Sequence, residues 1–553
     1  MALPQQPALS PAAPDLTHIV KVQLTTGLLL AAIAFPWVSP LSWGPNPDML
    51  QRLATAGSCA LFLLVWAVGG HRMPRASLVA TVAWGWLLAA LLSACMAWVQ
   101  YFGAVDPGWS DWIMQTTQGT AFANLRQRNQ FATLTSIGLL SLLWLAHRPA
   151  DAAPLALPAL RTAALGAAVL LLAGGNAASS SRTGALQWIL IAAVAWFWSR
   201  RSTDAGKGTA WRWSLWALAA YLAANLALPY ALQSLTGQVP NNAFARFSED
   251  AGSQSRMILW TNVMELITVH PWTGWGWGEL KFAHFMHPYA GARFSEILDN
   301  AHNLPLQLAV ELGLPAAIVL SLLALWGWWS LVRPGSEGER QTGEPATVGA
   351  AAVIVTTAGL HSLLEYPLWY SYFLLPTAFA WGLGLAARQG VAREAGGARP
   401  RWCLAGGVVM ALMAIWCALD YQAAANIYAP RPGASSLERR IAFAKQMPWW
   451  GYQADYAEVT VVDKSEPSAP PQAFRRTLHN LLDARLMMAY ARSLAEHGEI
   501  DKARFVVARL KEFKNASAKT FLAACDAPPV PGQEPPFQCA PPQRHYAWRE
   551  LLP

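Results

Sequence analysis

Eleven apolar runs, each long enough to cross a lipid bilayer, constrain the fold of this chain more than any other feature. A membrane-spanning helix needs about 20 consecutive apolar residues, with a range of about 17–25. Runs of this length lie near residues 20–38, 53–70, 77–99, 129–147, 159–176, 183–199, 211–229, 306–331, 347–366, 368–387 and 402–420. The sequence therefore predicts an all-α, polytopic integral membrane protein with about eleven transmembrane helices.

The composition agrees with this prediction. Hydrophobic residues make up 54% of the 553 residues and charged residues 13%, which is about half the charge of a typical soluble domain. The net charge of +8 comes from short basic clusters between apolar runs, so it indicates membrane topology and not a nucleic-acid partner. The first apolar run follows a Pro- and Ala-rich segment without a basic region, which predicts a retained helix and not a cleaved signal peptide.

Basic residues divide the loops into two sets. The richer set holds Arg72, Arg75, Arg148, Arg161, Arg200, Arg201, Lys207, Arg212, Arg333, Arg340, Arg388, Arg393, Arg399 and Arg401. The alternate short loops hold Arg52, Arg126, Arg128 and Arg182. The richer set should face the cytoplasm. This orientation predicts a cytoplasmic segment (1–19), membrane helices (20–229), a large outer loop (230–304), further membrane helices (305–420) and an outer C-terminal domain (421–553).

The C-terminal segment has the composition of a soluble domain. Its stretch LDARLMMAYARSLAEHGEIDKARFVVARLKEF, residues 482–513, has apolar residues at spacings of three and four, which predicts two amphipathic helices joined at HGEID. The pair resembles a tetratricopeptide unit, and a generic helical pair fits it equally well. Cys525 and Cys539 follow, and they could form a disulfide if this segment lies outside the cytoplasm.

Five polar motifs lie at or between the apolar runs, and the predicted orientation puts all five at the outer surface. They are ANLRQRNQFATL (123–134), SSSRTGALQW (179–188), GSQSRMILW (252–260), LDNAHNLPLQLAVELGLP (298–315) and HSLLEYPLWYSY (361–372). Each has a simple structural explanation, such as a snorkelling arginine or a histidine that caps a helix. Their position at one surface favours a functional site, whereas a transporter would need ionisable residues within the membrane.

The motif around His302 suggests chemistry at a helix start. Pro305 fits the first turn of a helix, and the apolar run Leu304–Val332 is longer than a bilayer core, so its start should protrude. A helix N-terminus suits phosphate and helps to keep His302 neutral, as a general base requires. Arg256 opens an amphipathic helix, and its guanidinium suits pyrophosphate oxygens. His361 and Glu365, four residues apart, should share a helix face.

Together, these motifs resemble the bacterial O-antigen ligase and polymerase superfamily, and most closely its O-oligosaccharyltransferases, which glycosylate pilins and other periplasmic proteins. Five stretches occur in the family's order: RQRNQFATL, SSSRTGA, SRMILW, DNAHNLPLQLAVELG and HSLLEYPLWY. The resemblance covers most of the membrane region. RQRNQ and HSLLEYPLWY favour the protein-glycosylating branch in particular.

The resemblance implies a glycosyltransferase that moves a glycan en bloc from undecaprenyl pyrophosphate to Ser or Thr hydroxyls of periplasmic proteins such as pilin. It implies a bacterial inner-membrane protein whose site faces the periplasm, an inverting reaction, no cofactor and no metal. An O-antigen ligase that uses lipid A core as acceptor, an O-antigen polymerase and a lipid-glycan transporter are the alternatives.

The resemblance also assigns roles to residues. His302 corresponds to the family's essential histidine, and Arg182 and Arg256 to its two phosphate-facing arginines, with Arg128 as a further contact. Either Tyr366 or Tyr370 corresponds to the family's functional tyrosine. The residues expected to support the site or to contact the donor or acceptor are Glu365, His361, Asn303 and Gln130.

Overall fold

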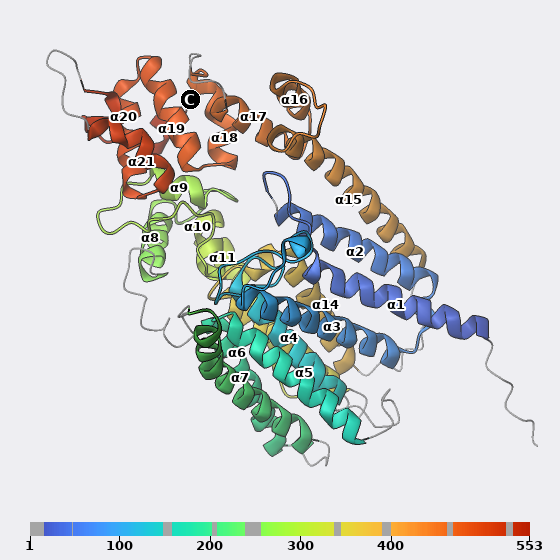
Figure 1. Cartoon of the computed structure of the whole chain (residues 1–553). Coiled ribbons are helices and arrows are strands. Elements are labelled where there is room, and N and C mark those ends of the chain that lie inside the picture. The colour runs from blue at the N-terminus through green and yellow to red at the C-terminus, as the bar shows by residue number, and fades with distance from the viewer. Residues whose placement is uncertain are drawn as a thin grey trace, which may run out of the picture.

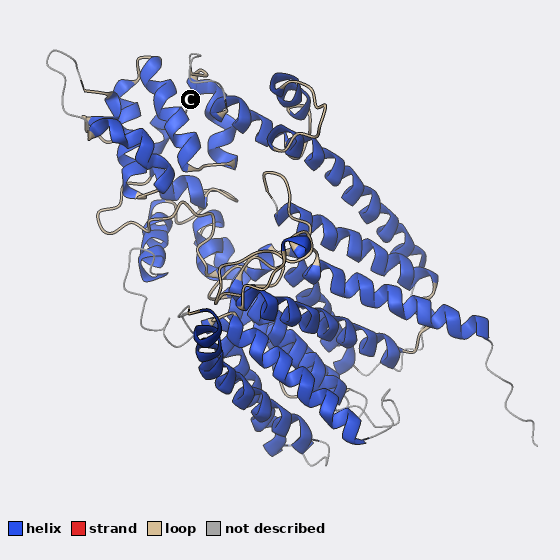
Figure 2. Ribbon diagram, viewed as in Figure 1, coloured by secondary structure: helices blue, strands red, loops and turns tan. Residues whose placement is uncertain are grey.

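The chain folds entirely into helices and connecting segments over the residues that the structure, a computed structural model, describes (Figures 1 and 2). These residues are 16–46, 48–146, 158–201, 207–237, 256–336, 344–389, 400–461, 468–526 and 535–552. Within them, eight helices are long and apolar enough to cross a membrane: α1 (Leu16–Val38), α2 (Asp48–Val68), α3 (Arg75–Tyr101), α4 (Arg128–Ala146), α5 (Pro158–Ala178), α7 (Lys207–Thr236), α11 (Leu314–Val332) and α15 (Pro400–Tyr428). The prediction of an all-α polytopic membrane protein is confirmed.

The three remaining predicted spans are also helices, although they are shorter or less apolar. They are α6 (Arg182–Arg201), α13 (Pro345–Ser362) and α14 (Ser371–Arg388). Short 3₁₀ helices occur in the connections: η1 (Gly70–Arg72), η2 (Pro107–Trp109), η5 (Pro367–Trp369), η6 (Pro471–Phe474), η7 (Ala523–Cys525), η8 (Phe537–Cys539) and η9 (Trp548–Leu551).

Small residues let the central membrane helices pack closely. α4 is the most enclosed of the candidate spans and lies against α3, α5, α6 and α13. A Cβ atom on Gly138 of α4 would lie 2.3 Å from the Cβ of Ala90 on α3, so only glycine permits this approach. Without a hydrophobic driving force between helices in lipid, such close backbone contact is a main source of association. The position of α4 in turn fixes the polar residues at its start.

Three shorter helices form a layer between the membrane bundle and the C-terminal helices (Figure 1). They are α8 (Arg256–Val269), α9 (Leu280–Met286) and α10 (Leu304–Leu312). The C-terminal helices are α16 (Leu437–Ala444), α17 (Gly451–Thr460), α18 (Arg475–Asn480), α19 (Ala484–Glu496), α20 (Ile500–Glu512) and α21 (Ala516–Leu522). The predicted amphipathic pair is present as α19 and α20, which pack together, and the structure joins Cys525 to Cys539 by a disulfide.

The α9 helix shares one hydrophobic core with the C-terminal helices. Phe282, Phe285 and Met286 of α9 lie buried in the same cluster as the apolar faces of α19 and α20. Next to this core, the guanidinium of buried Arg293 donates to Glu512 of α20, with 2.5 Å between Nε and Oε2, and also to the carbonyl oxygens of His284 and His287. The C-terminal helices therefore brace the segment that leads from α9 to His302.

The outer end of α15 is tied to its neighbours by polar contacts. α15 packs along α2 and continues toward α16 and α17 (Figure 1). The buried carboxylate of Asp420 accepts from the backbone N–H groups of Trp449 and Trp450, at 3.0 and 3.1 Å. The hydroxyl of Tyr421 donates to the carbonyl oxygen of Trp43 at 2.9 Å. These contacts connect the last membrane helix to both the N-terminal helices and the C-terminal ones.

Two of the predicted helix boundaries that differ from the structure affect the site. The apolar run Leu304–Val332 is not one helix, because it breaks at Gly313 into α10 and α11. Gly313 has φ +84° and ψ 163°, a conformation open almost only to glycine. The predicted span 347–366 ends earlier, at Ser362, so Glu365 lies in a turn beyond the helix.

Replacement of Gly313 by alanine should destabilise the protein by about 3 kcal/mol, because the backbone is strained for any L-residue and the new Cβ adds a clash. That Cβ would lie 2.3 Å from the carbonyl oxygen of Trp272. Denaturant unfolding in detergent micelles measures the effect. Gly291→Ala is the matched control, since a Cβ there meets no atom within 4 Å. Equal stability of the two variants would contradict this account of the break.

Candidate active site

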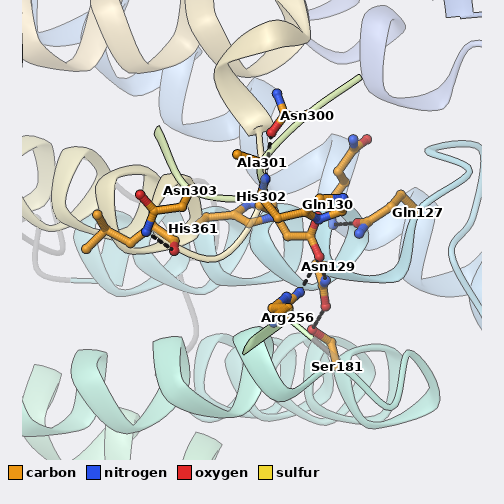
Figure 3. A network of polar contacts seen from close by, with 12 residues as sticks. Gln127, Asn129, Gln130, Ser181, Arg256, Asn300, Ala301, His302, Asn303 and His361 are labelled. Atoms are coloured by element: carbon orange, nitrogen blue, oxygen red, sulfur yellow. Dashed lines mark hydrogen bonds and ion pairs between the residues drawn. The ribbon is translucent and has the colours of Figure 1, made fainter. Parts of the chain in front are cut away.

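Four helix starts converge at one end of the membrane bundle. Arg128, Arg182 and Arg256 are the first residues of α4, α6 and α8, and Asn303 caps α10. Figure 3 shows residues from all four segments grouped together. Each helix start offers backbone N–H groups without helical partners and about half a positive charge. The convergence therefore creates a region suited to an anion.

The carboxylate of Glu365 connects these helix starts. Its Oε2 accepts from Nδ1 of His302 at 2.6 Å, and its Oε1 accepts from the Arg256 guanidinium and, at 2.9 Å, from the Asn129 amide. Glu365 is 6% exposed, so it needs these partners to remain ionised. Burial acts to raise its pKa, but the His302 hydrogen bond and the charge of Arg256 outweigh it and hold the pKa below its ordinary value.

The Asn129 amide extends the network to α6. Its carbonyl oxygen accepts from the Ser181 hydroxyl at 2.6 Å, while its nitrogen donates to Glu365. Ser181 directly precedes Arg182, so this pair of bonds sets the start of α6 against the start of α4 (Figure 3). Neither Asn129 nor Ser181 is among the site residues expected from the sequence. Their polarity within RQRNQ and SSSR was visible, but their pairing depends on helix packing.

His302 occupies an unusual backbone position that its neighbours hold in place. Its φ is +52°, in the left-handed region that non-glycine residues rarely adopt. The Asn300 side chain accepts from its backbone N–H at 2.8 Å, and the Gln307 side chain accepts from the N–H of Ala301 at 2.7 Å. Asn303 accepts from Leu306 as the α10 cap. These bonds direct the imidazole toward Glu365.

Backbone strain is concentrated in this region. The described residues contain five non-glycine positions with positive φ, and four of them are Ala123, Arg126, Ser180 and His302. All four lie in the motifs that form the site. Such conformations cost of the order of 1–3 kcal/mol each and persist where the surrounding structure enforces them, typically at functional sites. The concentration favours a functional site at this end of the bundle.

With Nδ1 held by Glu365, the other ring nitrogen of His302, Nε2, has no hydrogen-bond partner among the described residues. The side chain is 24% exposed. A carboxylate that fixes one imidazole nitrogen and leaves the other for the substrate is the arrangement of a general base. The position of His302 at a helix N-terminus predicts a neutral imidazole, and the structure adds a specific carboxylate partner, Glu365.

The two candidate tyrosines line the same site. The ring of Tyr366 meets His302 edge-on, with centroids 5.0 Å apart, and stacks on Tyr370 at 5.8 Å. Burial raises the pKa of the Tyr366 phenol, so it stays a neutral hydrogen-bonding group. Gln130 lies behind them and accepts from the Tyr372 hydroxyl at 2.5 Å. Tyr366 is the candidate that directly contacts His302.

The prediction that His361 and Glu365 share a helix face is wrong, because Glu365 lies beyond the end of α13, although its backbone N–H still donates to the carbonyl oxygen of His361 at 2.8 Å. α13 ends at Ser362, so Glu365 turns toward His302. His361 is fully buried between α13 and α4, where its Nδ1 lies 2.9 Å from the hydroxyl of Thr133. Gln187 of α6 donates to the same hydroxyl at 2.8 Å. His361 therefore connects membrane helices below the site.

The site contains cationic groups but no obvious metal centre. Arg128 and Arg182 lie half-buried at their helix starts, where a positive side chain is unfavourable unless an anion is near. In the part of the chain that the structure describes, no group of three His, Cys, Asp or Glu side chains could hold a metal ion. The arrangement offers guanidinium groups, helix N–H groups and an imidazole.

Comparison with known families matches three segments of the chain. The family described as "O-Antigen ligase" matches residues 167–321, which include Arg182, Arg256 and His302. "Virulence factor membrane-bound polymerase, C-terminal" matches residues 349–524, and "Protein glycosylation ligase" matches residues 121–146, the motif around Asn129.

Two curated proteins of Acinetobacter baylyi are similar to this chain. A "General O-oligosaccharyltransferase" is 27% identical over 311 residues, which cover 54% of this chain and 48% of that protein. A "ComP-specific O-oligosaccharyltransferase" is 23% identical over 305 residues, which cover 55% of this chain and 51% of that protein. This chain thus spans about half the length of the curated relatives it matches.

Replacement of Glu365 by glutamine should lower the free energy of unfolding at pH 7 by about 2 kcal/mol, because Arg256 and His302 lose a charged acceptor. The pKa of Glu365 lies below the unfolded value of about 4.3. Its stabilisation is therefore complete above that value and disappears as the pH falls through the lower, folded pKa. The free energies of unfolding of the wild type and of Glu365→Gln, measured from pH 3 to 7, should approach each other at the acid end of this range.

The matched control is Glu265→Gln. Glu265 also binds a histidine, His287, at 2.9 Å, but its side chain is 38% exposed. An exposed pair of this kind contributes less than about 1 kcal/mol. A gap between wild type and Glu365→Gln that stays constant with pH would contradict an ionised Glu365.

Proposed function

Because the chain belongs to the O-antigen ligase family and is of the O-oligosaccharyltransferase type, we propose that it transfers a lipid-linked glycan en bloc to protein hydroxyl groups. The donor is a glycan on undecaprenyl pyrophosphate, and the acceptors are Ser or Thr residues of exported proteins such as pilins. The observation that carries the proposal is the contact of one buried carboxylate, Glu365, with both His302 and Arg256. This contact supports a role for His302 as the acceptor-activating group and for Arg256 as its phosphate-binding neighbour.

The donor pyrophosphate binds among the guanidinium groups of Arg128, Arg182 and Arg256. Guanidinium groups suit phosphate oxygens because they present paired donors in a plane. The nearby helix starts add N–H donors. Together they neutralise the negative charge that grows on the leaving pyrophosphate, which is the main requirement of this reaction. In this proposal the cations are protein side chains, and the reaction is independent of metal.

His302 acts on the acceptor. Its Nε2 takes the proton of the Ser or Thr hydroxyl, while Glu365 holds Nδ1–H and stabilises the imidazolium that forms. The hydroxyl oxygen forms a bond to the anomeric carbon as the bond from that carbon to the phosphate oxygen breaks. The electron pair leaves with undecaprenyl pyrophosphate. One displacement from the opposite face inverts the anomeric configuration.

The location follows from the charge distribution. We propose that α1 to α7, α11, α13, α14 and α15 cross the bacterial inner membrane and that the site faces the periplasm, where flipped lipid-linked glycans are accessible. The support is the concentration of basic residues in the loops at the other end of the bundle. Residues 421–553 then form a periplasmic helical domain that supplies acceptor surface.

The acceptor separates this proposal from two related ones. An O-antigen ligase would use lipid A core, and an O-antigen polymerase would use a second lipid-linked glycan. The chemistry at His302 is the same in all three. The match of residues 121–146 to the protein glycosylation ligase family supports a protein acceptor. Purified protein supplied with lipid-linked glycan and either a pilin or lipid A core distinguishes them by which acceptor gains mass.

His302→Ala should reduce glycan transfer by about 100- to 10,000-fold, the usual contribution of a general base. Transfer to the pilin is measured by a gel shift and by mass spectrometry. His71→Ala is the control, because His71 lies at the opposite end of the bundle, where its Nδ1 is near the carbonyl oxygen of Trp66. Wild-type transfer by the His302 variant would refute the assignment of the base.

Arg256→Lys should raise the KM for the lipid donor and lower kcat/KM by about tenfold, because lysine keeps the charge but loses the planar pair of donors. The KM for the acceptor should not change. Arg200→Lys is the control, since Arg200 stacks on Trp196 at the cytoplasmic end. An unchanged donor KM in Arg256→Lys would remove Arg256 from the donor site.

A further inference from the structure

Two tryptophans stack beside the active site. The rings of Trp277 and Trp369 lie nearly parallel, 11° apart, with centroids separated by 5.9 Å. They come from distant segments: Trp277 lies in the turn between α8 and α9, and Trp369 ends η5. Trp277 is 64% exposed. One face of its indole packs on Trp369, so its opposite face is open to solvent.

The turn that carries Trp277 is held rigidly on both sides. Before it, Trp275 is inserted into the protein, where its indole N–H donates to the carbonyl oxygen of Leu266 at 3.0 Å. The backbone N–H of Gly276 donates to the carbonyl oxygen of Glu311 at 3.0 Å. After it, Glu279 binds His479 of α18 at 2.9 Å. The exposure of Trp277 is therefore a fixed feature of the fold.

The stacked pair is connected to His302 through Tyr366. The backbone N–H of Trp369 donates to the carbonyl oxygen of Tyr366, whose ring meets His302 edge-on. Polar groups lie beside this path. Lys281, four residues after Trp277, faces Asp299, three residues before His302, at 3.8 Å, and the Asp299 side chain is 65% exposed. An aromatic surface and a polar pair thus adjoin the reacting group.

We propose that Trp277 and Trp369 form a sugar-binding subsite that holds the donor glycan next to His302. A pyranose ring has one face of C–H groups, which packs on an aromatic surface, and a rim of hydroxyl groups, which need polar partners. The indole pair supplies the surface, and Lys281 and Asp299 supply the partners. This inference rests on the proposed transferase function and adds a position for the transferred glycan.

Trp272 shows what distinguishes this pair from tryptophans that anchor a protein at the membrane interface. Trp272 is 77% exposed and has no aromatic partner among the described residues. It lies beside the start of α11, since the N–H of Leu314 donates to the carbonyl oxygen of neighbouring Pro271. That position suits an interfacial aromatic residue. Trp277 instead stacks on a second element that leads to the active site.

The test compares two lipids and three variants in nanodiscs. Binding is measured for polyprenyl pyrophosphate that carries a disaccharide and for bare polyprenyl pyrophosphate. Trp277→Ala should weaken binding of the sugar-bearing lipid by about tenfold and leave binding of the bare lipid unchanged. Trp277→Tyr should restore most of the lost affinity, because it keeps an aromatic face. Trp272→Ala, the matched control, should bind both lipids as the wild type does.

Three outcomes would overturn the subsite. The first is that Trp277→Ala loses affinity for both lipids equally. The second is that Trp272→Ala weakens binding as much as Trp277→Ala does. The third is that the wild type binds the two lipids with equal affinity. If the wild type still transfers the glycan, each of these outcomes refutes the subsite but not the proposed transferase function. Failure of the wild type to transfer any lipid-linked glycan would instead refute the proposed function, whatever the binding results.

Discussion

The burial of one carboxylate, Glu365, determines the arrangement of the site. A buried charge is unstable without partners, and removal of one partner leaves the others uncompensated. The partners of Glu365 come from α4, from the start of α8 and from the segment before α10. Two of these partners, Asn129 and Arg256, are more than 100 residues apart in the sequence. The same ionised group that requires these partners also fixes their relative positions.

The strained backbone of His302 needs support from outside the membrane bundle. Asn300 and Gln307 hold the strained turn locally. Further support comes through α9, which shares a hydrophobic core with the C-terminal helices, and through Arg293, which is fixed by Glu512. The C-terminal helices therefore contribute to the geometry of the site through the segment that carries His302.

Much of the fold was predictable because membrane helices obey simple local rules. Each of the eleven predicted spans contains a long helix, and the amphipathic pair after residue 482 is present as α19 and α20. The error at Gly313 has a clear origin. Hydropathy follows composition, and LGLP is as apolar as the helices around it, so the break depends on a backbone conformation that only glycine adopts. The error at His361 has a related origin, because the end of α13 redirects Glu365 away from the helix face.

The class of protein, the helical segments and the clustering of polar motifs at one surface can all be inferred from the order of the amino acids. These depend on the length of apolar runs and on the position of basic residues, both of which can be read along the chain. The tertiary structure decided which polar residues meet. Only helix packing brings Ser181 to Asn129, Glu365 to His302, and Trp277 to Trp369. Such pairings depend on contacts between segments far apart in sequence, where no local periodicity applies.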